Sequence, residues 1–170
     1  MYQNTATAND KNISFFLRKI GKLSNQKQIT AISNIKSFIL AGNAIFTLRN
    51  TNADTRLTFK FSEPNDSNKQ KKVPVFASVL TGNDNVNDYK FVGTIWQNQQ
   101  LNYRHSIKSS ITPNAKSAKT IEWLINHVND NRELPTFVEF WHEGKCGKCG
   151  RSLTDPISID IGLGPICRNK

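Results

Sequence analysis

Residues 43–61 have the sequence NAIFTLRNTNADTRLTFKF, two runs of alternating apolar and polar side chains around a polar turn. The apolar positions of the alternation are Ala44, Phe46, Leu48, Leu57, Phe59 and Phe61. A period of two is typical of strands with one buried face, so we predict a hairpin closed by the turn at residues 50–54. The other face of the second strand carries Arg56 and Lys60. They could lie along a phosphate backbone, although an ordinary solvated sheet face shows the same alternation.

Further strands are predicted on the C-terminal side of this hairpin. Runs at residues 73–80 and 89–96, with a shorter one at 100–105, have strand composition and are separated by polar turns. Because the connections are short, we predict a mainly antiparallel sheet of about four or five strands. Residues 135–141 predict one more strand, which leads directly into the cysteine-containing end of the chain.

Helical periodicity precedes the sheet and returns once after it. Apolar residues at helical spacing predict a short helix over residues 13–21 and a second from about residue 25 to Gly42. The apolar residues of the second stripe are Ile29, Ile32, Ile35 and Ile39. A third helix is predicted to start near Ser117, with Lys116 and Lys119 at its N-terminus, where a bound phosphate would benefit from the helix dipole.

All three cysteines of the chain lie near its C-terminal end, two as Cys146-Gly-Lys-Cys149 and the third, Cys167, after a Gly-x-Gly-Pro turn. Two cysteines separated by two residues can bind one metal ion from a single tight turn. Cys167 would add a third sulfur and His142 a nitrogen, which completes the four ligands of a closed tetrahedral site. We therefore predict a structural Zn²⁺ site formed by His142, Cys146, Cys149 and Cys167.

Other roles for these residues are open at the level of the sequence. C-x-x-C is also a redox motif, but no strand-turn-helix pattern surrounds this pair, and an odd cysteine count leaves one thiol unpaired in any disulfide scheme. His142 could instead be a solvated surface histidine, and His105 and His127 lie in other predicted elements. Glu143 is the nearest candidate general base, although a solvated carboxylate is the simpler interpretation.

Motifs of common enzymes are absent from the sequence. It contains no phosphate loop, no H-E-x-x-H and no G-x-S-x-G, and its thirteen acidic residues are scattered. A catalytic zinc ion would also need an open coordination position, which four protein ligands do not leave. We expect no enzymatic activity.

The cysteine-containing segment also resembles a known family. Residues 142–159, HEGKCGKCGRSLTDPISI, are followed by GLGPIC at residues 162–167. This segment resembles a small zinc-ribbon-like domain of unknown function that recurs in bacteriophage and prophage proteins, with the pattern C-G-x-C-G-R-x-L-T-x-P-x-S-I followed by G-x-G-P-x-C. The resemblance implies bound zinc and an origin in a phage or another mobile element. It implies no activity, because the family has none assigned.

Together these patterns predict an α+β fold: a small, mainly antiparallel sheet with N-terminal helices and one later helix, plus a C-terminal zinc-knuckle segment. We expect an α+β body over residues 1–141 and a zinc-binding segment over residues 142–170 that packs on it. With 170 residues the chain is long enough to bury a core. It has neither a membrane-length apolar run nor the features of a signal peptide, so we expect a soluble cytoplasmic protein without a membrane partner.

The chain is strongly basic, with 23 Lys and Arg against 13 Asp and Glu and a net charge of +10. A basic surface attracts phosphate groups and releases their counterions, so this balance favours nucleic acid or an acidic protein as partner, although many soluble domains carry such charge only as a solvated surface. The candidate contact residues come from the hairpin, from the polar loop at residues 62–72, and from the third helix with the loop before it. They are Arg56, Lys60, Lys69, Lys71, Lys72, Lys108, Lys116 and Lys119.

Aromatic residues are interleaved with basic ones in the later strands. They are Tyr89, Phe91, Trp96 and Tyr103, beside Lys90 and Arg104. This mixture would suit base stacking next to phosphate contacts, but aromatic residues in strands are more simply explained as core residues or cross-strand pairs.

Three functions are compatible with these features. The first, which we predict, is a small phage-type zinc-binding accessory protein that contacts nucleic acid through a basic surface, without base-specific recognition. The alternative is a phage anti-defence inhibitor, for example an anti-CRISPR-like protein, that binds a host nucleic-acid-guided protein complex. A third is a virion or assembly component whose charge is incidental. The sequence does not specify DNA or RNA, a host target or the oligomeric state.

Overall fold

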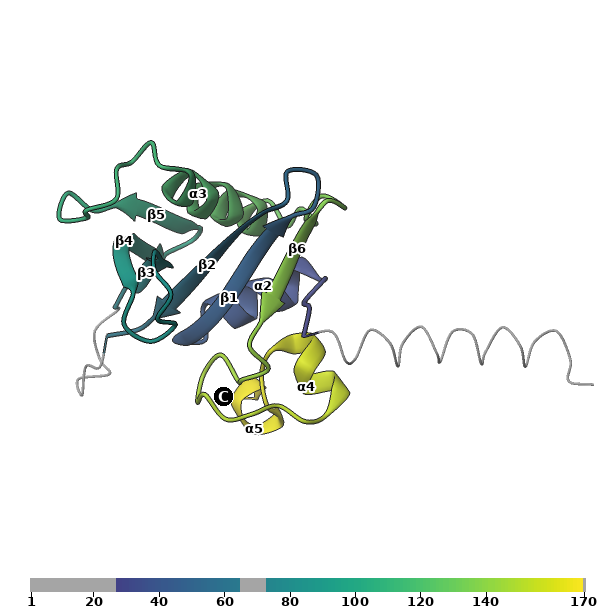
Figure 1. Ribbon diagram of the computed structural model, residues 1–170. Coiled ribbons are helices and arrows are strands. Elements are labelled where there is room, and N and C mark those ends of the chain that lie inside the picture. The colour runs from purple at the N-terminus through teal and green to yellow at the C-terminus, as the bar shows by residue number, and fades with distance from the viewer. Residues whose placement is uncertain (1–26, 65–72, 170) are drawn as a thin grey trace, which may run out of the picture.

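The computed structural model describes residues 27–64 and 73–169, and it confirms the predicted α+β class (Figure 1). The elements are α2 (Ile32–Ile39), β1 (Asn43–Asn50), β2 (Thr55–Ser62), β3 (Val75–Leu80), β4 (Tyr89–Gln97), β5 (Leu101–His105), α3 (Lys116–Asn129), β6 (Val138–His142), α4 (Pro156–Ile161) and α5 (Pro165–Arg168). The helix predicted over residues 13–21 lies outside the described residues. The same is true of Lys69, Lys71 and Lys72.

The six strands form one antiparallel sheet in the order β5-β4-β3-β2-β1-β6. The predicted hairpin is confirmed, because β1 pairs with β2 along its full length, from Asn43 opposite Ser62 to Asn50 opposite Thr55. β6, which comes last in the chain, pairs with β1 and not with its sequence neighbours. The strand that leads into the cysteines therefore lies beside the strand that opens the hairpin.

The helices α2 and α3 pack on one face of the sheet and enclose the hydrophobic core with it. In Figure 1, α2 lies behind β1 and β6. The apolar side chains of the hairpin point toward this core, and Phe46 of β1 stacks on Phe140 of β6 with ring centroids 4.6 Å apart. The alternation in residues 43–61 therefore correctly separates the buried face of the hairpin from its outer face.

The segment before α2 corrects the sequence prediction, because residues 27–31 are extended and not helical. The N–H of Ile29 donates to the carbonyl of Phe140 at 3.0 Å, and the N–H of His142 donates to the carbonyl of Lys27 at 2.9 Å. These bonds cover the outer edge of β6, which would otherwise present unpaired backbone groups. α2 begins only at Ile32, whose N–H donates to the Glu133 carboxylate at 3.2 Å.

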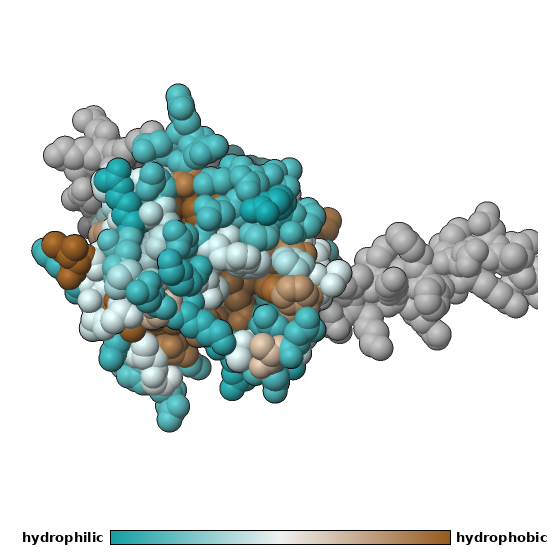
Figure 2. Space-filling model, turned by 90° about the horizontal axis from the view of Figure 1, so that it is seen from above, coloured by the Kyte–Doolittle hydropathy of each residue, from teal (hydrophilic) through white to brown (hydrophobic). Residues whose placement is uncertain are grey.

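No helix among the described residues covers the other face of the sheet. Its middle is formed by Thr47 and Thr58, which face each other in the β1–β2 register and whose hydroxyl oxygens are 2.8 Å apart. Seen from above, the described surface is mostly hydrophilic and its hydrophobic residues are visible as small patches (Figure 2). Within the described part of the chain, no helix is both long enough and apolar enough to cross a membrane.

Candidate metal centre

The first two cysteines lie in a tight turn just beyond β6. The N–H of Cys146 donates to the carbonyl of Arg151 at 2.8 Å, and the N–H of Gly150 donates to the carbonyl of Cys146 at 2.9 Å. Lys145 and Ser152 pair as an antiparallel bridge on the two sides of the turn. A chain that reverses direction in this way holds two cysteines at C-x-x-C spacing close enough to share one metal ion.

The third cysteine is delivered by two short helices that the sequence analysis did not predict. α4 starts at Pro156, where the Asp155 carboxylate accepts N–H bonds from Ile157 at 3.1 Å and Ser158 at 3.2 Å. α5 also starts at a proline and contains Cys167. These helices are too short to show apolar periodicity, but an N-cap aspartate followed by proline, and a glycine followed by proline, are recognised start signals.

The fold brings the sulfur atoms of Cys146, Cys149 and Cys167 within 4.8 Å of one another. Sulfurs bound to one tetrahedral zinc ion at the usual bond length are about 3.8 Å apart, so only a small adjustment separates this group from a metal site. Cys146 is buried, Cys149 is exposed, and none of the three forms a disulfide. The three cysteines could therefore hold a metal ion.

The electrostatics of the sulfur group also favour a bound cation. Burial raises the pKa of the Cys146 thiol, but hydrogen bonds from the backbone of Cys149, Gly164 and Lys148 and from the Cys149 thiol outweigh it and lower the pKa to about 7. The pKa of the Cys167 thiol is raised to about 11. The largest cause is its hydrogen bond with the Cys149 thiol, and burial and the neighbouring Cys146 raise it further. Three neighbouring sulfurs cannot all ionise cheaply without a positive charge between them, and a metal ion supplies that charge.

His142, the predicted fourth ligand, is not brought into this group. Its side chain is buried and both ring nitrogens have backbone partners: the N–H of Gly144 donates to Nδ1 at 3.1 Å, and Nε2 is 2.9 Å from the carbonyl oxygen of Ile159. Since Nδ1 accepts, the ring proton lies on Nε2 and donates to Ile159. In this structure His142 connects the end of β6 to the cysteine turn and to α4.

The segment packs closely on the ring of Phe38 in α2. A Cβ atom on Gly147 would lie 2.8 Å from two carbons of this ring, and one on Gly162 would lie 2.3 Å from the ring and 2.9 Å from Ile29. Gly162 also has a positive φ of 75° at the end of α4. Only glycine allows both backbones to approach a buried aromatic ring this closely.

The predicted nucleic-acid contacts are not brought onto one surface. Arg56 is exposed on the face without helices, and Lys60, on the same face, has its Nζ 5.8 Å from the centre of the Tyr89 ring. Lys108 is exposed in the loop after β5. Lys116 and Lys119 lie in the first turn of α3, on the opposite side of the sheet.

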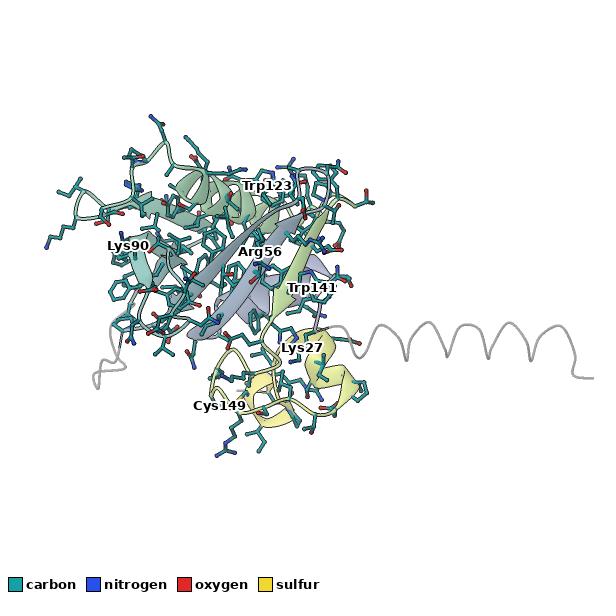
Figure 3. The ribbon with its side chains drawn as sticks, in the orientation of Figure 1. Lys27, Arg56, Lys90, Trp123, Trp141 and Cys149 are labelled. Carbon is teal, nitrogen blue, oxygen red and sulfur yellow. The ribbon has the colours of Figure 1, made fainter. Side chains whose placement is uncertain are left out.

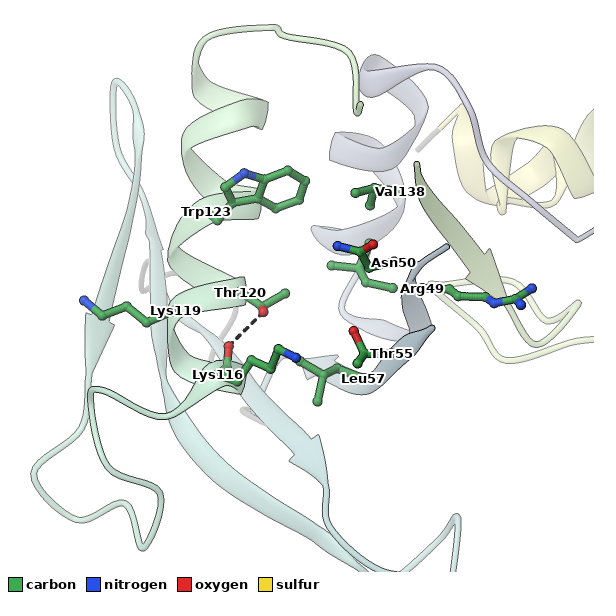
Figure 4. Close-up of a pocket in the computed structure, with 10 residues that line it drawn as sticks. Arg49, Asn50, Thr55, Leu57, Lys116, Lys119, Thr120, Trp123 and Val138 are labelled. Carbon is green, nitrogen blue, oxygen red and sulfur yellow. Dashed lines mark hydrogen bonds between the residues drawn. The ribbon is translucent and has the colours of Figure 1, made fainter. Parts of the chain in front are cut away.

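Lys116 and Lys119 line a cavity of about 250 Å³ between α3 and the hairpin (Figure 4). Trp123 and Val138 face each other across it, and Lys119 points away from it toward solvent. Lys119 also pairs with Glu122 at 3.4 Å. The two lysines thus do not converge on one point, and the predicted anion site at this helix start gains no geometric support.

Comparison with known proteins gives a family match that includes the three cysteines. Residues 139–170 match the family described as Family of unknown function (DUF6011). The match starts inside β6 and includes the cysteine turn, α4 and α5, so it coincides with the segment that the sequence motifs single out. No curated protein and no solved structure matches the chain. The similarity covers the candidate metal centre and carries no activity with it.

Proposed function

We propose that the protein binds zinc in its C-terminal segment and contacts single-stranded nucleic acid through the face of the sheet that α2 and α3 leave uncovered. The observation that carries this proposal is a hollow on that face, lined by aromatic and hydroxyl side chains together with Glu143, with Lys60 beside the Tyr89 ring. A phage origin rests on the motif resemblance alone, and a place in the host cytoplasm would follow from it.

The hollow has a volume of about 170 Å³ and lies between Trp141 of β6 and Tyr89 of β4, with Thr47 and Thr58 beneath. β4 is four strands away from β6 in the sheet, so the sheet must curve strongly to place these two aromatic rings on one hollow. Figure 3 shows Trp141 and Arg56 on the side of the sheet turned toward the viewer. A curved sheet with aromatic side chains is a common platform for stacked bases.

The Tyr89 hydroxyl supports a polar ligand in this hollow. It is buried and has no hydrogen-bond partner in the described structure. Burial, and then the nearby Glu143 carboxylate, raise the pKa of Tyr89, so the hydroxyl keeps its proton and can donate. A buried hydroxyl without a partner is costly, and a base edge or sugar oxygen in the hollow would satisfy it.

Further aromatic and basic side chains extend the same face beyond the hollow. Phe76 and Phe91 are neighbours with ring centroids 5.8 Å apart. Arg104 of β5, which lies opposite Thr94 of β4, is exposed at the far edge. Stacking of a base on an aromatic side chain contributes about 1–3 kcal/mol and does not depend on the nucleotide sequence. It therefore agrees with binding that is not base-specific.

The charge of the described residues is more balanced than that of the whole chain. Residues 27–64 and 73–169 contain fifteen Lys and Arg against eleven Asp and Glu, whereas the whole chain has an excess of ten. More than half of the net positive charge therefore belongs to the remaining residues. Stacking in the hollow would have to contribute to affinity alongside phosphate attraction, because the described surface is only modestly basic.

Zinc is the metal that best suits the cysteine group. Three thiolates are soft ligands, and zinc accepts them in tetrahedral sites without redox chemistry. Bound there, the ion would hold the Cys146–Cys149 turn against α5. We assign the metal this structural role and propose no catalysis.

The experiment is a titration of labelled single-stranded DNA, single-stranded RNA and duplex DNA with the full chain at several salt concentrations, followed by fluorescence anisotropy. We expect single strands to bind more tightly than duplex. Arg56→Ala should make the slope of log K against log salt shallower by about 0.7, the value for one phosphate contact on a single strand. Trp141→Ala should weaken binding with little change in slope.

Matched controls lie on the opposite side of the sheet. Lys36→Ala removes an exposed lysine of α2, and Trp123→Phe alters a tryptophan of α3, so neither should change binding. If the control pair weakens binding as much as the Arg56 and Trp141 variants, or if no single strand binds, the proposed surface is wrong. A host protein complex that co-purifies with the chain after nuclease treatment would instead support the anti-defence alternative.

A further inference from the structure

Three sulfurs leave a tetrahedral metal ion one ligand short. Among the described His, Cys, Asp and Glu side chains, no fourth joins Cys146, Cys149 and Cys167 in a common cluster. The nearest histidine in sequence, His142, already uses Nδ1 to accept the Gly144 N–H and its Nε2 proton to reach Ile159.

A cavity of about 170 Å³ opens directly onto the sulfur group. All three cysteines line it, together with Arg151, Asp155, Ser158 and residues of the loops between them. Its volume is several times that of one water molecule, whose share of the liquid is about 30 Å³. A small ligand can therefore reach the sulfurs from this side.

The buried side chain of Ser158 adds a polar group to the lining of the cavity. Ser158 is only 1% exposed, and its hydroxyl has no hydrogen-bond partner. The Asp155 carboxylate is nearby, and the Ser158 hydroxyl helps to lower its pKa, as do the N–H groups of Ser158 and Ile157. The hydroxyl and the carboxylate do not, however, meet the geometry of a hydrogen bond. A buried hydroxyl without an acceptor, in a cavity lined by three side chains that could hold a metal ion, can donate to a ligand bound there.

We propose that the metal ion keeps its fourth coordination position open to this cavity, where it binds an exchangeable ligand that also accepts a hydrogen bond from Ser158. The ligand class is a small oxygen or nitrogen donor: water, or a small inorganic anion. This inference rests on the metal binding proposed above and changes the closed four-ligand site expected from the sequence into one with three protein ligands.

Charge at the cavity is compatible with either ligand. A zinc ion with three thiolates carries one net negative charge, which an anion would increase. Arg151 lines the cavity and supplies a positive side chain to offset it. Asp155 is the protein group that could compete for the position, but its carboxylate already accepts two N–H bonds at the start of α4 and would leave that helix uncapped if it moved to the metal.

The test uses the full chain loaded with Co²⁺, because Zn²⁺ has a filled d shell and gives no visible spectrum. Azide is added as a small anion, and the visible bands of Co²⁺ are followed. We expect a saturable spectral change at constant metal content, as azide replaces water. Ser158→Ala should bind Co²⁺ as the wild type does but bind azide about tenfold more weakly, because it lacks a hydrogen bond to a charged acceptor.

Three control variants separate the competing explanations. Ser152→Ala removes an exposed hydroxyl from the same cavity and should leave azide binding unchanged, since water already competes for that hydroxyl. His142→Gln and Asp155→Asn should keep the wild-type cobalt spectrum. A spectrum that changes in either variant would identify a fourth protein ligand and overturn the proposal.

Failure of this inference can be distinguished from failure of the proposed function. If the protein does not bind one equivalent of Co²⁺, or if the complex lacks sulfur-to-metal charge-transfer bands, the metal site itself is wrong. If Co²⁺ binds in that way but azide leaves the spectrum unchanged, the metal site stands and the open position is refuted. X-ray absorption of the zinc-loaded protein tests the metal site itself, with three sulfurs and one light atom expected around the ion.

Discussion

Replacing Gly162 by alanine should destabilise the protein more than replacing other glycines of the metal segment. Gly162 has φ of 75°, a conformation that costs an L-residue about 1–2 kcal/mol. Its new Cβ would lie 2.3 Å from Cδ2 of Phe38, far inside the optimal carbon–carbon separation of about 3.5–4.0 Å. Overpacking of this kind costs about 1–3 kcal/mol. The total expected loss is therefore about 2–5 kcal/mol.

The cost should be near the upper end of this range, because Phe38 cannot easily move aside. Its side chain is 1% exposed, and its ring packs edge-on against Phe140, with ring centroids 6.0 Å apart, and at a tilt against His142, with centroids 5.6 Å apart. Gly147 contacts the same ring from the cysteine turn. Any rotation of the ring would disturb the core or the metal segment.

Two other glycines of the segment serve as matched controls. Gly150 has φ of 72°, but a Cβ there would meet only the side-chain nitrogen Nδ2 of Asn43 at 3.3 Å, so Gly150→Ala should cost the backbone strain alone, about 1–2 kcal/mol. A Cβ on Gly164 would have ordinary contacts, the nearest at 3.8 Å, and Gly164→Ala should be nearly neutral.

Urea unfolding of the metal-free chain, followed by far-UV circular dichroism, measures these differences. We expect Gly162→Ala to lose more stability than Gly150→Ala, and Gly150→Ala more than Gly164→Ala. Adding Phe38→Leu to Gly162→Ala should cost less than the sum of the two single changes, since the smaller side chain removes the overlap. Equal losses for Gly162→Ala and Gly150→Ala, or strict additivity in the double variant, would refute the role given to Phe38.

Three shorter predictions concern other parts of the chain. Cys149→Ser should lose bound zinc and loosen the C-terminal segment, and mass spectrometry under native conditions that found full zinc retention would contradict the site. Burial is the main cause that lowers the pKa of His142 below its ordinary value of 6.5, so as the pH falls the ring is protonated in the unfolded chain before it is protonated in the folded one. The metal-free protein should therefore lose stability as the pH falls below about 6.5. Nuclear magnetic resonance of the ring should show the lowered pKa. Glu133→Gln should destabilise the protein by about 0.5–1.5 kcal/mol in thermal unfolding, because it weakens the bond to the Ile32 N–H at the start of α2.

The hairpin and the cysteine group were accessible from the sequence because each depends on local spacing. Alternation fixed the buried face of residues 43–61, and C-x-x-C spacing identified two of the three sulfurs. Ile29 shows where periodicity misleads. It shares helical spacing with Ile32, Ile35 and Ile39, yet it is buried from an extended segment that pairs with β6. Whether a segment such as residues 27–31 forms a helical turn or pairs with a sheet edge is decided by tertiary contacts, which the spacing of apolar residues does not reveal.

His142 and the hollow on the uncovered face show a second limit. The closeness of His142 to Cys146 in the sequence suggested a ligand, but the partners of its ring are Gly144 and Ile159, and the position of Ile159 depends on α4. Likewise, Trp141 and Tyr89 line one hollow only because the sheet curves. No local pattern in the sequence marks the hollow, since nothing local indicates how two residues so far apart in the chain will face each other.

The contact between Phe38 and the two glycines has a consequence for how this C-terminal segment can be inherited. The segment that matches the family starts inside a strand and presents glycine backbones to a ring that lies outside it. In this chain the segment therefore depends on the body for part of its packing. A different body could support the same contacts only if it offered an antiparallel neighbour for the strand and an aromatic side chain beneath the glycines.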